Sequence, residues 1–280
     1  MTSECLDSVF EQTKDVSFEV ILVDNASTDG SKEFFSKDPR IRYVYNEKNM
    51  GFGKANNIGF RHSKGEYVFL LNSDTILRNN AVKTFVEKEC EFDSRVCLGC
   101  VLLNKDLKPM HSYGSFPTIK NMFRYIWSYW FPKVVGNKNE PSASATYPLI
   151  VDYITGAALF IPRKIIDTFG FFDEDFFMYF EETELQYRYR QNDVKSVVIL
   201  GPDIVHYHGA SSVTKRKNMK GTMMNIQSRL IYAKKIFPYY GYLLVYFMHW
   251  LLIPRIIIGR SCWKEKFSTI KLILTAKRIF

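Results

Sequence analysis

The chain has 280 residues, of which 46% are apolar, 24% charged and 16% aromatic, and its formal net charge is +9. This composition excludes a disordered, collagen-like or low-complexity chain, and the length allows one large domain or two smaller ones. Five scattered cysteines, an odd number, exclude a disulfide framework. The single Cys97-Leu-Gly-Cys100 pair predicts two thiols on a buried strand rather than a zinc site. The first residues lack the pattern of a signal peptide, which favours a reducing, cytosolic setting.

The basic residues gather in the last quarter of the chain. Residues 1–212 hold 24 Lys and Arg against 28 Asp and Glu, a net charge of −4, whereas residues 213–280 hold 14 against one acid, a net charge of +13. The same quarter contains the most apolar stretch, residues 239–258. A basic segment around an aromatic, apolar stretch favours the surface of an anionic membrane. No base-reading motif accompanies the basic residues, so a nucleic-acid partner is not expected.

Two other interpretations of the apolar stretch stay open. A helix that spans a bilayer needs about 20 apolar residues. His249 and the Pro254-Arg255 pair interrupt the stretch, which favours a helix lying in the membrane interface over a spanning one. An ordinary packed helix with a solvated basic face is the remaining alternative.

Short apolar runs alternate with helical patterns in the first part of the chain. Helices are expected at 3–12, 31–36, 54–62 and 81–90, and strands at 18–23, 41–45 and 67–71. Residues 111–148 are aromatic and rich in turn formers, which predicts a long functional loop with a short helix. Further strands are expected at 153–161, 196–200 and 204–208, and a further helix at 163–169. The alternation predicts an α/β fold with a mostly parallel central sheet flanked by helices.

Polar side chains follow three of the predicted strands, and ligands of open α/β sheets bind beyond the carboxyl ends of strands. These side chains are Asp24 and Asn25, then Asn72 and Asp74, then His206 and His208. Asp74 and a histidine suit Mn²⁺, and Asp74 also suits Mg²⁺ together with substrate phosphates. A turn cap and ordinary histidines are the alternatives. We therefore expect one ligand site at this edge of the sheet.

An acidic cluster lies at 181–184. Within a helix, Glu184 and Arg188 are four residues apart and form a structural pair. Clustered carboxylates raise the pKa of one member, and such a group takes a proton from an attacking hydroxyl. A solvated acidic helix start is the alternative. No Walker motif and no complete dinucleotide motif occur, which counts against a P-loop ATPase and a standard dehydrogenase.

Six stretches, in the same order along the chain, resemble family 2 inverting glycosyltransferases, especially the rhamnosyltransferase-like branch of cell-surface polysaccharide assembly. The stretches are residues 23–31, 49–57, 70–75, 156–161, 170–181 and 205–209. They fall within about residues 3–212. The resemblance implies a GT-A fold, a nucleotide-diphosphate sugar donor and a divalent metal, Mn²⁺ or Mg²⁺.

Carried over position by position, the resemblance implies roles for individual residues. Asp24 would contact the nucleobase, and Glu182 would be the general base that deprotonates the acceptor hydroxyl for an inverting attack on the anomeric carbon. Asp74, the surviving carboxylate of the family's D-x-D position, and His206 would hold the metal. The other nucleotide-sugar-binding residues would be Asn25, Asn49, Gly51, Asn56, Asn72 and Gly156, with Asp74 counted among them. Supporting residues would be Glu181, Glu184, Arg188 and His208.

Two features depart from the family pattern. The base position usually holds Asp, and Glu182 is one methylene longer. The family's first strand is not found ahead of residues 18–23, and its loss would leave an inner slot of the sheet with unpaired backbone groups. We therefore expect an N-terminally truncated GT-A domain at 1–212 with an acceptor loop at about 111–150, from a late start codon, a truncated gene product or a crippled enzyme. Residues 213–280 would form a basic, apolar helical extension at the membrane interface.

The sequence thus predicts a metal-dependent inverting glycosyltransferase, peripheral at the cytoplasmic face of the plasma membrane. It would transfer a sugar to a hydroxyl of a lipid-linked glycan in polysaccharide assembly of the O-antigen or capsule type. The alternative is a catalytically impaired, membrane-associated binding or scaffold protein with the same fold, which the missing strand favours. A nucleotidyltransferase of similar fold has less support, because no Gly-rich phosphate loop opens the chain.

Overall fold

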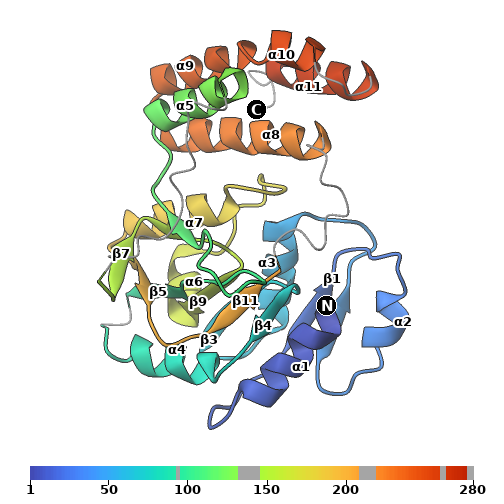
Figure 1. Cartoon of the computed structure of the whole chain (residues 1–280), viewed down its shortest axis with the longest axis vertical. Helices are drawn as coiled ribbons and strands as arrows, with labels where there is room; N and C mark the ends of the chain where they lie inside the picture. Colours follow the sequence, from blue (N-terminus) through green and yellow to red (C-terminus); the bar gives the residue numbers. More distant parts are fainter. Residues whose placement is uncertain (93–94, 132–145, 208–218, 259–262, 276–280) are drawn as a thin grey trace. The chain divides into compact units, whose positions relative to one another are not determined.

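The computed structural model describes residues 1–92, 95–131, 146–207, 219–258 and 263–275 (Figure 1). The chain divides into two compact units. We call the first the sheet unit; it comprises Met1–Ser115, Asn139–Glu174 and Glu182–Val213. We call the second the helical unit; it comprises Phe116–Lys138, Asp175–Glu181 and Thr214–Phe280. The helical unit therefore takes in part of the aromatic segment at 111–148 as well as the C-terminal residues.

A five-stranded mixed sheet forms the centre of the sheet unit. Its order is β3 (Tyr67–Leu71), β9 (Ala158–Pro162), β5 (Val96–Cys100), β10 (Lys195–Ile199) and β7 (Leu149–Val151). Strands β5 and β10 are parallel, whereas β9 is antiparallel to both β3 and β5, and β7 is antiparallel to β10. The sheet is therefore less parallel than the alternation of elements predicts, because β9 enters between β3 and β5 in the opposite direction.

All residues of β5 and β9 are buried, as their continuous apolar sequences require. Cys97 and Cys100 lie on β5, and both thiols are free. Burial raises the pKa of the Cys100 thiol to about 12. The prediction of two thiols on a buried strand is confirmed.

Three two-stranded pairs complete the sheet structure. They are parallel β1 (Ile21–Asp24) with β2 (Arg42–Tyr45), antiparallel β4 (Thr75–Leu77) with β11 (Ile204–His206), and antiparallel β6 (Tyr113–Gly114) with β8 (Tyr153–Ile154). Among the described residues, β1 has β2 as its only strand partner, and β3 has only β9.

Helices cover the sheet unit. They are α1 (Thr2–Gln12), α2 (Ser31–Phe35), α3 (Phe52–His62), α4 (Ala81–Glu89), α6 (Arg163–Phe169) and α7 (Glu181–Arg190). Helix α3 packs on β1 at Gly59, where a Cβ would lie 3.1 Å from the side chain of Val23. Helix α4 begins at its cap Asn80, and its buried Phe85 stacks on Phe160 of β9. These contacts close the core around the strands whose ends carry the candidate site.

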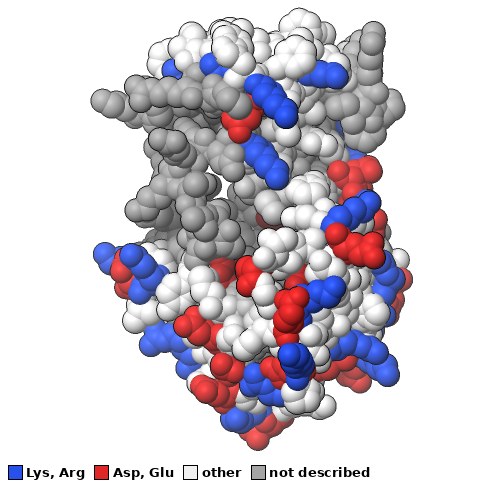
Figure 2. All heavy atoms as spheres, turned by 90° about the vertical axis from the view of Figure 1, so that its right-hand side faces the viewer, with Lys and Arg blue, Asp and Glu red and all other residues white. Residues whose placement is uncertain are grey.

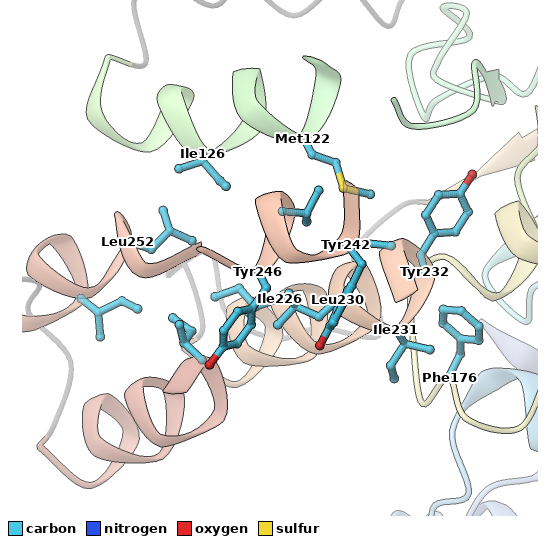
Figure 3. Packing of buried hydrophobic residues seen from close by; sticks show 14 residues of the cluster. Met122, Ile126, Phe176, Ile226, Leu230, Ile231, Tyr232, Tyr242, Tyr246 and Leu252 are labelled. Carbon is cyan, nitrogen blue, oxygen red and sulfur yellow. The ribbon is translucent and has the colours of Figure 1, made fainter. Parts of the chain in front are cut away.

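The helical unit contains α5 (Ile119–Trp130), α8 (Met219–Ile236), α9 (Tyr239–Trp250), α10 (Ile253–Ile258) and α11 (Trp263–Thr275). Helix α8 packs against α9 and α11, and α5 packs against α9. Figure 3 shows the core between these helices, where Met122 and Ile126 of α5 meet Tyr242 and Tyr246 of α9 and Leu230 of α8. The expected short helix in the aromatic segment is α5.

Candidate functional site

The carboxylate of Asp24 is buried at the carboxyl end of β1 and is held by two donors. The Tyr43 hydroxyl donates a hydrogen bond of 2.5 Å to Oδ2, and the backbone N–H of Ser27 donates one of 2.7 Å to Oδ1. Burial, and then the bond to Asp24, raise the pKa of Tyr43 above its ordinary value. Tyr43 therefore stays a hydrogen-bond donor across the physiological range, and the orientation of the carboxylate is fixed.

Asn25 holds the loop that precedes α3. Its Nδ2 donates to Oδ1 of Asn49 at 3.0 Å and to the carbonyl of Gly51 at 3.2 Å, while its Oδ1 accepts the N–H of Met50 at 2.8 Å. Gly51 has φ +85°, a conformation that favours glycine, immediately before the helix. Asn25, Asn49 and Gly51 are thus brought together beside Asp24. Asn56 lies one turn into α3, where its amide donates to the carbonyl of Phe52 at 2.9 Å.

Asp74, immediately before β4, lies next to His206, the last residue of β11. Nε2 of His206 lies 3.1 Å from Oδ1 of Asp74, and both side chains are buried. Pairing of β11 with β4 sets this approach, because His206 lies opposite Thr75, the residue after Asp74. The backbone N–H of Tyr207 also donates to the carbonyl of Asp74 at 2.8 Å.

Asn72 connects this pair to the turn before β9. Its Nδ2 lies 3.4 Å from Nε2 of His206, and its backbone N–H donates to the carbonyl of Ala157 at 3.0 Å. The residue next to Ala157 is Gly156. The structure therefore joins the end of β3 to the segment that contains Gly156.

Gly156 lies between Phe52 and Glu182. A Cβ built on Gly156 would lie 3.0 Å from the Phe52 ring and 3.9 Å from Cβ of Glu182. Phe52 directly follows Gly51, so the first turns of α3 and α7 approach each other across this glycine. Burial raises the pKa of the Glu182 carboxyl, although backbone N–H groups of Glu182 and Thr183 oppose the shift. A carboxyl in such surroundings is suited to accept a proton.

Gln186 fastens α7 to the sheet. Its amide exchanges two hydrogen bonds with the backbone of Ile154, of 2.8 Å to the N–H and 2.7 Å to the carbonyl. Its Nε2 also donates to the carbonyl of Glu182 at 3.0 Å, and the Ser196 hydroxyl on β10 donates to its Oε1 at 2.9 Å. The first turn of α7, and Glu182 with it, is therefore held at a fixed position beside β8.

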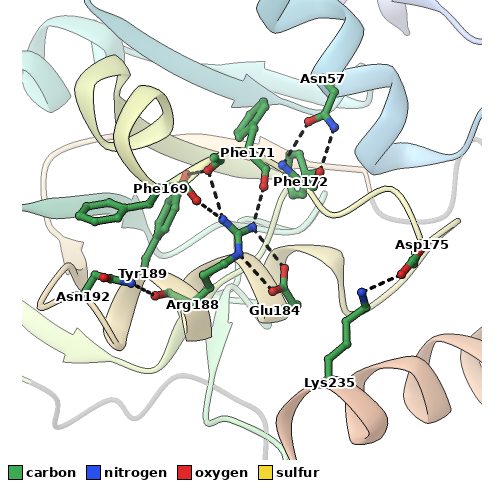
Figure 4. Close-up of polar contacts among 11 residues, drawn as sticks. Asn57, Phe169, Phe171, Phe172, Asp175, Glu184, Arg188, Tyr189, Asn192 and Lys235 are labelled. Carbon is green, nitrogen blue, oxygen red and sulfur yellow. Dashed lines mark hydrogen bonds and ion pairs between the residues drawn. The ribbon is translucent and has the colours of Figure 1, made fainter.

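Arg188 fastens the other side of α7 (Figure 4). Its guanidinium pairs with Glu184, at 3.2 Å from Nε to Oε1, and donates to the carbonyls of Phe169 and Phe171. The predicted pair of Glu184 and Arg188 is confirmed. It positions the turn after α6.

Two candidates remain, Glu181 and His208. Glu181, the first residue of α7, is buried and belongs to the helical unit. His208 lies outside the described residues.

Three residues near the site were not among those predicted. Tyr43 holds Asp24, Gln186 holds α7, and Asn57 exchanges hydrogen bonds of 2.9 and 3.1 Å with the backbone of Phe172 (Figure 4). Asn57 ends the stretch at 49–57, so that stretch was its only signal in the sequence. Tyr43 and Gln186 carry no local signal, because their partners are distant in the chain.

The residues present fit a divalent cation. The described residues contain no group of three or more His, Cys, Asp or Glu side chains arranged for a metal. Asp74 and His206 nevertheless present a carboxylate oxygen and an imidazole nitrogen 3.1 Å apart. Mn²⁺ accepts this pair of donors, and such sites commonly take their other ligands from substrate phosphates and water.

Comparisons with known proteins agree on one family. The family model described as Glycosyl transferase family 2 matches residues 1–158. Glycosyltransferase GlyG of Streptococcus pneumoniae serotype 4 is 36% identical over 100 residues, which cover 34% of this chain and 33% of GlyG. Low-salt glycan biosynthesis hexosyltransferase Agl10 of Haloferax volcanii is 24% identical over 224 residues, which cover 78% of this chain and 68% of Agl10. The chain spans only 18% of a further pneumococcal relative, GlyA.

A solved structure supports the fold. The crystal structure of GalNAc-T7 with UDP, GalNAc and Mn²⁺ matches 98% of this chain and 55% of that chain, with a TM-score of 0.57 and 14% identity. At this identity the likeness concerns the fold alone. The expected α/β fold of GT-A type is confirmed.

Proposed function

The chain belongs to glycosyl transferase family 2 and is a glycosyltransferase, and from this premise we propose that it transfers a sugar, with inversion, to a hydroxyl of a lipid-linked glycan. The donor is a nucleotide-diphosphate sugar, and a hexosyl or rhamnosyl donor fits the sequence resemblance. The product is a longer glycan for a surface polysaccharide of the O-antigen or capsule type.

One observation carries the proposal. The backbone contact of Asn72 with Ala157 joins the Asp74–His206 pair to the glycine that separates Phe52 from Glu182. A donor-binding end and a proton-accepting end are therefore linked through a few residues at the carboxyl ends of the strands. Donor and acceptor must meet in this arrangement for direct transfer.

The first strand and the loop after it would bind the donor. Asp24, held by Tyr43, offers its carboxylate to N–H groups of the nucleobase. Asn25, Asn49 and Gly51 give the adjoining loop its shape, and Asn56 and Asn72 complete the pocket on either side. Gly156 lets the Phe52 ring lie close to the backbone beside Glu182, because any side chain there would meet that ring.

Asp74 and His206 would hold a divalent cation, Mn²⁺ or Mg²⁺. When bound, this cation supplies positive charge that stabilises the leaving diphosphate. The residues fit this task through their convergence and their burial.

Glu182 would act as the general base. The acceptor O–H gives its proton to the Glu182 carboxylate while the acceptor oxygen forms a bond to the anomeric carbon. The bond from that carbon to the diphosphate oxygen breaks, and the nucleoside diphosphate leaves with the electron pair. Attack from the face opposite the diphosphate inverts the anomeric centre in one step. Gln186 and Arg188 hold α7 so that the carboxylate keeps its place.

Segments of the chain outside this site support the proposed lipid-linked acceptor and the proposed location at the membrane. The aromatic segment at 111–150 and the basic residues of 213–280 would keep the protein at the cytoplasmic face of the plasma membrane, where a lipid-linked glycan is presented. The charge of +13 in the last 68 residues supports an anionic surface there.

Within the described part of the chain, β1 and β3 each pair with one strand, which bears on the strength of donor binding. Val20, just before β1, packs against the same core cluster as Phe69 and Leu71 of β3. A strand between β1 and β3 would pair both edges, as in the family's pattern, and we propose that the nucleotide site reaches full affinity only with such a strand. A donor screen on the chain with an added N-terminal strand tests this; equal affinity with and without the strand contradicts it.

Titration calorimetry with a panel of nucleotide sugars, with and without Mn²⁺, tests the function directly. We expect one donor to bind in the presence of the metal, and mass spectrometry to show its sugar on a lipid-linked acceptor. No binding under either condition contradicts the proposal and supports a catalytically impaired binding or scaffold protein of the same fold.

A further inference from the structure

The apolar stretch at 239–258 forms two helices, α9 and α10. One face of these helices is buried in the helical unit, and the opposite face is exposed. Tyr242 and Tyr246 of α9 point into the core of the helical unit (Figure 3), and Val245 belongs to the same core. On the opposite side, an exposed stripe runs at steps of three or four residues. It consists of Tyr240, Leu244, Phe247 and Leu251, and it continues to Ile258 at the end of α10. Burying one face therefore leaves the second apolar face in solvent within the described part of the chain.

Helix α5 adds a second exposed stripe beside the first. Phe123, Trp127 and Phe131 stack in sequence, with ring centroids 5.7 and 4.8 Å apart, and all three are exposed. The indole N–H of Trp130 donates to the carbonyl of Leu251 at 3.1 Å, which ties the end of α5 to the end of α9. We call the exposed residues of α5, α9 and α10 the apolar face.

The apolar face cannot be part of a spanning helix without loss of the core. The 20 residues of Tyr239–Ile258 are long and apolar enough to cross a membrane. They are broken into two helices at 251–252, and His249 is fully buried against the other helices. Crossing a bilayer would require these residues to leave the core of the helical unit. A helix that keeps its packing and offers only its outer stripe lies along one leaflet.

The basic residues near the apolar face indicate which kind of partner binds to it. Exposed basic residues lie on α10 and on the helix packed against it. Arg255 is on α10, and α11, which packs against α9 and α10, carries the exposed Lys264 and Lys271 beside the exposed Trp263 and Phe267. Residues 213–280 contain a single acid, Glu265. Figure 2 shows Lys and Arg among uncharged side chains on the visible face of the helical unit, at its upper end. Such an arrangement matches anionic headgroups around an acyl interior and repels a second copy of the same face.

We infer that the apolar face is a one-leaflet membrane-insertion surface, in which the stripes of α5, α9 and α10 enter the acyl boundary and the basic residues bind anionic headgroups. The inference extends the membrane location given in the proposed function. It rests on that proposed function for the lipid-linked acceptor. It names the face and the depth of insertion, which the sequence left open.

Intrinsic fluorescence provides the test, because all four tryptophans (Trp127, Trp130, Trp250 and Trp263) belong to the helical unit and are exposed. The full chain is mixed with vesicles of phosphatidylcholine alone or with added phosphatidylglycerol, some carrying brominated acyl chains. We expect binding to the anionic vesicles and quenching by bromine near the headgroup end of the chains. Binding independent of lipid charge, or quenching strongest at the bilayer centre, overturns the inference.

The double variant Leu244→Glu with Phe247→Glu tests the face. We expect partitioning into anionic vesicles to fall at least about tenfold, since two apolar side chains are lost from the interface. The matched control is Phe34→Glu on α2 of the sheet unit, a site 63% exposed, which keeps wild-type partitioning. If the double variant loses its helical circular dichroism, the milder Phe247→Ser replaces it, and the quenching of the wild type still decides the depth.

Two further results would overturn the inference. Light scattering that shows a dimer abolished by Leu244→Glu with Phe247→Glu means that the face pairs two copies. Resistance to carbonate extraction means that the segment spans the bilayer. Donor binding measured without vesicles is unchanged in the double variant, so failure of the membrane surface is distinguished from failure of the proposed activity.

Discussion

The imidazole Nε2 of His206 lies 3.1 Å from the carboxylate Oδ1 of Asp74, although 132 positions separate the two residues in the chain. Pairing of β11 with β4 produces this approach, because it sets His206 opposite Thr75. The two residues are far apart in the sequence, and only the fold brings this imidazole nitrogen and this carboxylate oxygen together.

Replacement of His206 by Ala tests the metal assignment. We expect the Mn²⁺-dependent part of donor affinity to fall by about tenfold or more, since one ligand of the cation is lost. Asp74→Asn should act in the same direction. The measurement is titration calorimetry with the donor, with and without Mn²⁺. His62→Ala, an exposed histidine on α3, is the matched control; a loss equal to that of His206→Ala would count against the assignment.

Replacement of Glu182 by Gln should lower kcat by about 10²–10⁴-fold while donor affinity stays near its original value, because the acceptor proton has no destination. The exposed Glu174, changed to Gln, is the control. A variant at Glu182 that keeps wild-type kcat excludes this residue as the base.

The pH dependence of the wild type follows from the raised pKa of Glu182. The base works only when ionised, so kcat should fall as the pH is lowered through a pKa above that of an ordinary glutamate. The folded state binds this proton more tightly than the unfolded state, so the same group favours folding at low pH and this contribution is lost as the pH rises through the raised pKa. A pH–rate profile with an acidic limb at the ordinary glutamate pKa would contradict the assignment.

Gly156→Ala should weaken donor binding and destabilise the fold by about 1–3 kcal/mol, because the added Cβ meets the Phe52 ring at 3.0 Å. Combining it with Phe52→Leu replaces the ring with a smaller side chain and should restore more than half of the loss. Urea unfolding and the donor KM measure both effects. Gly221→Ala in α8 is the control, since its Cβ would meet its nearest neighbour at 3.9 Å; if the double variant is no better than Gly156→Ala, the contact with Phe52 is not the cause.

Tyr43→Phe should raise the Kd for the nucleotide by about tenfold and weaken discrimination between nucleobases, since the Asp24 carboxylate loses the donor at 2.5 Å that orients it. Tyr45→Phe on the same strand is the matched control. Loss of stability with unchanged base discrimination would give Tyr43 a structural role only.

His249 should make the helical unit sensitive to acid. Burial lowers its pKa to about 4 from 6.5. Its contribution to stability is therefore complete above pH 6.5 and is lost as the pH falls toward 4, by about 3 kcal/mol at most. Urea unfolding followed by tryptophan fluorescence should show this slope in the wild type and a much smaller one in His249→Leu. An equal slope in both proteins excludes His249 as the source.

Local patterns sufficed to predict many of the elements. The strand at 67–71 and the helix at 163–169 appear with the expected bounds, and the helix at 81–90 ends one residue earlier, because each has its own run of apolar residues and its own end signals. The short strand β4 was not expected, since it follows directly after the turn at Asn72 and forms only through pairing with β11.

The direction of strand β9 and the contacts between residues distant in the sequence could not be predicted, for a physical reason. The antiparallel entry of β9 depends on how the chain returns from the segment before it, which no local pattern records. Likewise, the spacing of Glu184 and Arg188 predicts their ion pair, but not the carbonyls of Phe169 and Phe171 that the same guanidinium reaches. Six stretches at strand and helix ends indicated the candidate site, whereas the residues that hold those stretches in place became visible only in the fold.

The two hydrogen bonds between the Gln186 amide and the Ile154 backbone have a consequence for the acceptor. Because a side-chain amide continues the hydrogen bonding of β8 into α7, the helix cannot slide to absorb the extra methylene of Glu182. With Glu182 as the proposed base, the attacking hydroxyl would therefore bind farther from the helix axis than it would with an aspartate. A switch between Glu and Asp at this one position would then retune which hydroxyl of a sugar ring is selected, with the scaffold unaltered.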